Sequence, residues 1–136
     1  MTRLHYLKTE ELLGKTITSI EVMRSKEDDG EGEELILTTT DGWTYVYHHP
    51  QDCCESVTIK DICGELEWLL NSPLLLASEE SKEQEGDSAL YEDRSTTWTF
   101  YNFATVKGHV TITWFGESNG YYSEEVYLKK KLTGVE

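Results

Sequence analysis

The stretch from Trp98 to Leu128 limits the fold more than any other part of the chain. It contains three consecutive runs rich in β-branched and aromatic residues, at 98–108, 109–116 and 117–128, with glycines at the breaks between them. Residues of this kind favour β-strands, and short breaks that contain glycine favour hairpin turns. The sequence therefore predicts a three-stranded antiparallel meander near the C-terminal end of the chain.

The glycines at the two breaks also predict the strand register. Three-residue hairpin loops prefer a left-handed residue at their last position, which glycine adopts without steric cost. Loops at 106–108 and 118–120 meet this requirement. The resulting register pairs Phe100 with Trp114 and places Glu124 on the other side of Trp114, all on one face of the meander.

A gap in that face is the first candidate for a ligand site. Gly116 has no side chain, and the predicted register places it between Trp98 and Tyr122. A flat ring would stack in such a gap while Glu124 accepts its hydrogen bonds. The predicted ligand-binding residues are Trp98, Trp114, Asn119, Tyr122 and Glu124. The alternative is that other core side chains fill the gap and that Glu124 lies at a solvated end of the sheet.

Two further elements complete the predicted architecture. Residues 34–40 and 43–49 alternate in hydrophobicity around Asp41-Gly42, which predicts a hairpin with a two-residue turn. Asp61 is placed to cap a helix through Leu70, in which Ile62, Leu66 and Leu69 or Leu70 have helical spacing. We therefore predict an α+β fold: a mainly antiparallel, curved sheet of about six or seven strands, with one packed helix at about 61–70.

Length and charge limit the domain organisation. A chain of 136 residues is one domain by size, so residues 1–136 are expected to form a single domain. Residues 78–93 are highly charged and poor in apolar side chains, which predicts a mobile acidic loop inside that domain. The net charge of −14 opposes direct binding to nucleic acids or anionic membranes, which requires basic patches.

The same properties predict a cytoplasmic protein. The chain has no apolar run of 18 residues and no apolar signal segment at its N-terminus. Its three cysteines form no CxxC pair, so a common structural zinc site is not indicated and reduced thiols are expected. No cofactor is predicted. A homodimer is a further expectation, because both faces of the predicted meander carry aromatic residues.

The segment from His48 to Glu55 concentrates metal-binding chemistry. The weak candidate ligands are His48, His49, Asp52, Cys53 and Cys54. On a strand, adjacent histidines point to opposite faces and cannot bind one ion without a bulge. The alternative is a tight turn that Asp52 caps. A cysteine nucleophile with a histidine base is a further alternative, but no oxyanion donor can be named, so no catalytic residue is assigned.

Several segments resemble an uncharacterised family of small phage and prophage proteins. They are the pattern from His49 to Val57 (HxQDCCExV), the WxFY string that begins at Trp98, and the pattern from Gly108 to Glu124, which includes WxGxSNGYYSE. The resemblance spans roughly residues 34–128. It implies a phage origin and carries no activity or site residue.

Three functions remain open. The first is a phage-type counter-defence factor that sequesters a small nucleotide-like ligand at the Glu124 gap. The second is an acidic inhibitor of a host protein, which would act as a nucleic-acid mimic through its negative net charge. The third is a metal-dependent or thiol enzyme at 48–55. The partner is expected to be a small molecule or a host protein.

Overall fold

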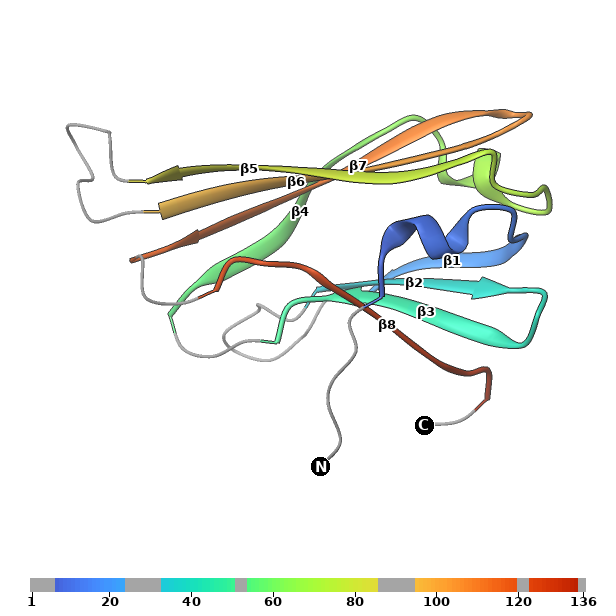
Figure 1. Cartoon of the computed structure of the whole chain (residues 1–136), viewed down its shortest axis with the longest axis horizontal. Helices are drawn as coiled ribbons and strands as arrows, with labels where there is room; N and C mark the ends of the chain where they lie inside the picture. Colours follow the sequence, from blue (N-terminus) through green and yellow to red (C-terminus); the bar gives the residue numbers. More distant parts are fainter. Residues whose placement is uncertain (1–6, 24–32, 51–53, 86–94, 120–122, 135–136) are drawn as a thin grey trace.

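The computed structural model of the protein describes residues 7–23, 33–50, 54–85, 95–119 and 123–134. These residues form two four-stranded antiparallel sheets that face each other as the layers of a sandwich (Figure 1). One sheet has the order β1–β2–β3–β8, with strands Ile17–Met23, Glu34–Thr39, Trp43–His48 and Tyr127–Leu132. The other has the order β4–β7–β6–β5, with β4 Ser56–Cys63, β5 Leu76–Glu85, β6 Ser95–Thr105 and β7 Gly108–Ser118.

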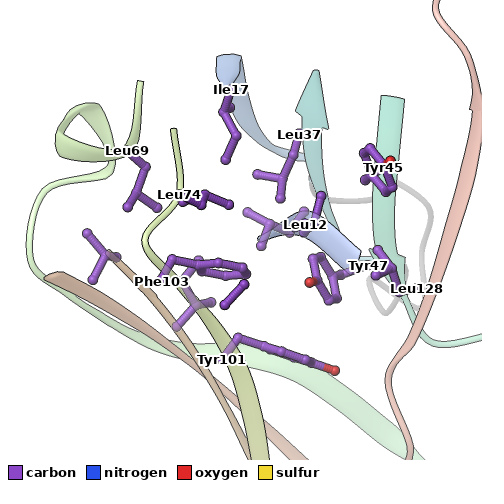
Figure 2. Packing of buried hydrophobic residues seen from close by; sticks show 14 of the residues in the cluster. Leu12, Ile17, Leu37, Tyr45, Tyr47, Leu69, Leu74, Tyr101, Phe103 and Leu128 are labelled. Carbon is purple, nitrogen blue, oxygen red and sulfur yellow. The ribbon is translucent and has the colours of Figure 1, made fainter. Parts of the chain in front are cut away.

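The hydrophobic core lies between the two sheets. Alternate residues of β2 and β6 point inward, as the alternating burial of these two strands shows. Tyr47 from β3 packs its ring against Tyr101 and Phe103 from β6, with ring centroids 4.5 and 6.2 Å apart (Figure 2). Two short 3₁₀ turns, η1 (Thr9–Leu12) and η2 (Leu66–Leu69), contribute the buried side chains of Leu12 and Leu69.

The predicted α+β class is wrong, because the segment 61–70 is not an α-helix. Its first residues belong to β4, which pairs with β7, and only the single turn η2 follows. The β-branched side chains of Val57 and Ile59 point into the core from β4, which favours the extended conformation. The helical spacing from Ile62 onward therefore arises from a strand end followed by a turn. Neither described helix is long or apolar enough to cross a membrane.

The predicted mobile loop at 78–93 is also wrong over its first part. Residues 78–85 belong to β5, which pairs with β6 in an unbroken antiparallel register of ten residue pairs. Residues 86–94 lie outside the described residues. This polar segment forms an edge strand instead of a loop. Its hydrogen-bonded pairing with β6 stabilises the strand despite the low hydrophobicity of its residues.

The predicted meander forms only in part. Strands β6 and β7 form its first hairpin, but the third run does not add to β7, because β4 occupies the other edge of β7. The chain crosses to the opposite sheet instead, where β8 pairs with β3 and places Leu128 opposite Tyr47. Leu128 is buried there.

The β6–β7 register differs from the prediction by one residue. Thr105 pairs with Gly108, so the turn contains only Val106 and Lys107, and Thr99 rather than Phe100 lies opposite Trp114. Gly108 is needed for close packing: a Cβ there would lie 2.6 Å from the Trp68 ring. A one-residue shift moves every side chain of one strand to the other face.

The predicted hairpin at 34–49 is confirmed as β2 and β3, but its two-residue turn is wrong. A two-residue turn at Asp41-Gly42 would pair Leu37 with Val46, whereas Leu37 pairs with Tyr45. The carboxylate of Asp41 accepts hydrogen bonds from the Thr39 hydroxyl and the Trp43 amide, which closes a longer turn than the sequence indicates.

Candidate functional site

Glu124 lies where the chain crosses from one sheet to the other between β7 and β8. Its side chain is buried, at 6% exposure. A Cβ added to Gly116 would lie 2.9 Å from the Cβ of Glu124 and 3.0 Å from its carbonyl oxygen. The missing side chain of Gly116 therefore lets the crossing segment pack directly on β7. The gap predicted over Gly116 is filled by Glu124 itself.

Two hydroxyl groups hold the carboxylate of Glu124. The Thr97 Oγ1 donates to Oε1 at 2.6 Å, and the Ser118 Oγ donates to Oε2 at 2.5 Å. Both hydroxyl residues are buried, and they come from β6 and from the end of β7. Hydrogen bonds to an ionised acceptor offset part of the cost of burying its charge. Strands β6 and β7 therefore each supply a hydroxyl group to one oxygen of the Glu124 carboxylate.

A buried histidine–glutamate pair anchors the same crossing segment. The Nε2 of His49 lies 2.7 Å from a carboxylate oxygen of Glu55, and its Nδ1 lies 2.6 Å from the carbonyl oxygen of Glu125. The side chains of His49 and Glu55 are 2% and 0% exposed. A carbonyl oxygen can only accept, so Nδ1 must carry a proton, and the pair shares a second proton between Nε2 and the carboxylate. The pair thus ties the end of β3 to the residue next to Glu124.

A groove of about 320 Å³ lies between the inner face of β5 and β6 and the crossing segment. Most of its lining side chains carry a carboxylate or a hydroxyl group. The lining residues are Glu79, Ser81, Glu83, Ser95, Thr97, Thr99, Tyr101, Ser123, Glu124, Glu125 and Val126. Four of these residues are glutamates, and no lysine, arginine or histidine is among them. The groove therefore presents hydrogen-bond acceptors and negative charge.

The neighbours of Tyr101 show the electrostatic character of this groove. Burial raises the pKa of the Tyr101 phenol, and the nearby carboxylates of Glu79 and Glu125 raise it further. Glu79 also accepts a hydrogen bond of 2.6 Å from the Thr9 hydroxyl of η1, which fixes one wall of the groove. A site with this field favours a ligand that has N–H donors and positive charge, and it disfavours phosphate groups.

The structure separates the predicted ligand-binding residues. Trp98 lies on the outer face of its sheet, where its ring packs at 4.5 Å on Phe115. Trp114 lies on the inner face and is 1% exposed; its indole nitrogen has no hydrogen-bond partner in the described part of the chain. Asn119 is exposed beyond the end of β7. Tyr122 lies outside the described residues, and of the four that are described only Glu124 lines the groove.

The candidate metal ligands are separated as well. His48 is the last residue of β3 and lies near the Tyr127 ring of β8, whereas His49 follows the strand and is buried against Glu55; burial lowers the pKa of His48. Both ring nitrogens of His49 form hydrogen bonds within the protein, so this side chain offers no lone pair to a metal ion. Cys54 is disulfide-bonded and offers no thiolate. Asp52 and Cys53 lie outside the described residues. Within the described ranges, no three histidine, cysteine or acidic side chains are grouped to hold a metal ion.

The sequence pattern does not predict most of the residues that line the groove. Glu79, Ser81 and Glu83 line the groove from β5, in a segment whose composition predicts a loop. Every residue from Ser78 to Glu85 is polar, so the alternation of apolar and polar residues that indicates a half-buried strand is absent. Glu125 has no sequence signal either, since its place at the groove depends on the crossing between the sheets.

Comparison with known proteins identifies the family of this chain. A family model described as a domain of unknown function, DUF7448, matches residues 10–128, so the chain belongs to that family. Neither a curated protein nor a solved structure matches the chain.

Proposed function

We propose that this member of the DUF7448 family is an acidic binding protein whose groove takes up positively charged side chains of another protein. One observation carries the proposal: four glutamates line the groove and none of the lining residues is basic. A lysine ammonium or an arginine guanidinium would form charge-assisted hydrogen bonds with these carboxylates. The net charge of −14 would speed encounters with a basic partner.

The biological role that we propose is inhibition of a basic host protein. The resemblance of the segments at 49–57 and 108–124 to small phage proteins supports a phage-encoded protein that acts in the cytoplasm of the infected cell. An acidic chain that covers a basic surface would block the nucleic acid or the protein that normally binds there. Sequestration of a nucleotide-like ligand stays an untested prediction, and the acidic groove gives it no support.

Titration with defined probes tests the proposed function. The basic probe is a nonapeptide of alternating lysine and threonine, capped at both ends; cyclic dinucleotides and ADP-ribose represent the nucleotide alternative. We expect the peptide to bind with micromolar affinity, on the order of −8 kcal/mol, and the nucleotides to leave the melting temperature unchanged. Nucleotide binding without peptide binding would reverse the proposal.

Paired variants locate the binding site. The double variant Glu83→Gln, Glu125→Gln removes two groove carboxylates and should weaken peptide binding about tenfold. The control Glu21→Gln, Glu67→Gln makes the same change in net charge at exposed positions on β1 and η2. It should change the affinity less than twofold, about 0.4 kcal/mol. Equal effects of the two variants would show that net charge alone attracts the peptide and would exclude the groove as the site.

A further inference from the structure

The four edge strands of the two sheets differ in how they oppose pairing with another chain. The registers of β1 and β4 are irregular, between Ile17 and Ser19 and between Ile59 and Asp61. Strand β8 has six residues and carries Lys129–Lys131. Bulges, short length and lysines are the features by which natural edge strands avoid unwanted pairing. Strand β5 has ten residues and continuous register, and its charged side chains, four glutamates and Lys82, oppose pairing with an acidic or apolar strand but not with a basic one.

The same strand forms one wall of the acidic groove. Glu79, Ser81 and Glu83 point from β5 into the groove, while Glu80 and Lys82 belong to the opposite face. A strand added along β5 would place alternate side chains about 5 Å from these residues, on the groove side of the extended sheet. Lysine or arginine at alternate positions would then lie beside the carboxylates of Glu79 and Glu83.

We infer that the protein binds an extended basic segment of its partner by strand addition to β5. Main-chain hydrogen bonds to the edge supply affinity, and the alternating basic side chains supply specificity through the groove. The inference rests on the proposed function and specifies its binding mode. Charge also selects against a second copy of this chain, because two β5 strands would place carboxylates opposite carboxylates.

A backbone-modified peptide tests this inference separately from the proposed function. The alternating lysine–threonine nonapeptide is compared with a version N-methylated at its central lysine and at the following threonine. In a strand, neighbouring N–H groups point to opposite edges, so this modification removes one donor from each edge while all side chains and charges remain. We expect the modified peptide to bind at least about tenfold more weakly, because it loses main-chain hydrogen bonds and its methyl groups obstruct the edge.

Hydrogen exchange gives the second readout. With the unmodified peptide bound, amides of 76–85 should exchange more slowly, while those of the other edge strands β1, β4 and β8 should not change. Equal affinities of the two peptides, without protection of β5, would overturn strand addition and leave the acidic groove as a site for side chains alone. If neither peptide binds, the proposed function itself fails.

Discussion

Glu124 lines the acidic groove because of contacts that its neighbours in the sequence do not reveal. Its carboxylate is buried because Gly116 leaves room for its backbone and because Thr97 and Ser118 donate to it. The predicted Trp98 wall is absent from this site, because Trp98 lies on the other face of the sheet. In the sequence Glu124 stands between Ser123 and Glu125, and the hydroxyl groups that donate to it are 6 and 27 residues away in the chain.

At the residue scale, the His49–Glu55 pair should stabilise the fold strongly. Replacing His49 by Phe removes the imidazole that shares a proton with Glu55 and leaves a carboxylate beside an apolar ring. Breaking a buried pair in this way costs about 3–5 kcal/mol. Urea unfolding of His49→Phe should show this loss, and the double variant His49→Phe, Glu55→Leu should recover most of it.

An exposed histidine provides the control for that experiment. His109→Phe lies on the surface of β7 and should change the free energy of unfolding by less than about 0.5 kcal/mol. If His49→Phe is equally mild, or if the double variant is no more stable than the single one, the pair does not stabilise the crossing segment as its geometry indicates.

The hairpin of β2 and β3 shows the importance of turn chemistry at the scale of one element. Asp41 accepts hydrogen bonds from Thr39 and Trp43 and forms an ion pair of 2.8 Å with Lys15. The hydrogen bond from Lys15, followed by the one from Thr39, lowers the pKa of Asp41 from 3.8 to about 2. The side chains of this ion pair are 32% and 37% exposed, so its energy is reduced by solvent screening.

The predicted consequence is a loss of stability in acid. Because the folded pKa is below the unfolded one, the contribution of Asp41 is complete above pH 4 and disappears as the pH falls from about 4 to about 2. After screening it should amount to less than about 1 kcal/mol. Unfolding of wild type and Asp41→Asn across this range should show a difference that shrinks toward pH 2; a constant difference would contradict the assignment.

Strand β5 is the element for which composition misleads most. Its charged residues predict a loop when they are considered alone, but β6 offers a continuous ladder of partners along its whole length. Pairing with a neighbouring strand outweighs an intrinsic preference of about 1 kcal/mol or less per residue. The result is an edge strand whose side chains also form a groove wall, which connects the fold of this segment with its proposed function.

At the scale of the whole molecule, a net charge of −14 should make folding and binding respond to salt in opposite directions. Raising NaCl from about 0.05 to about 0.5 M shortens the Debye length from roughly 14 to roughly 4 Å. Self-repulsion of the folded chain then decreases, so the melting temperature should rise by a few degrees, on the order of 1 kcal/mol. Binding of the lysine–threonine peptide should weaken by about tenfold or more.

Thermal unfolding and peptide titration on the same samples measure both effects. The control variant Glu21→Gln, Glu67→Gln carries a net charge of −12, from −14 + 2, and should gain less stability from salt than the wild type. Peptide affinity that does not depend on salt would show that the acidic groove is not the basis of binding.

Strand propensity and alternation are local properties, so the amino-acid sequence alone predicts the β-rich character of the chain and several of its strands. The β2–β3 and β6–β7 hairpins follow from such patterns. The register of both hairpins, the strand at 56–63 and the departure of β8 to the opposite sheet are fixed only when the two sheets assemble. Each of these features depends on contacts with residues that are distant in the chain. A shift of one residue in the register moves the side chains of a strand to its opposite face. The groove depends on all of them together, since β5, β6 and the crossing segment meet only when both sheets are assembled.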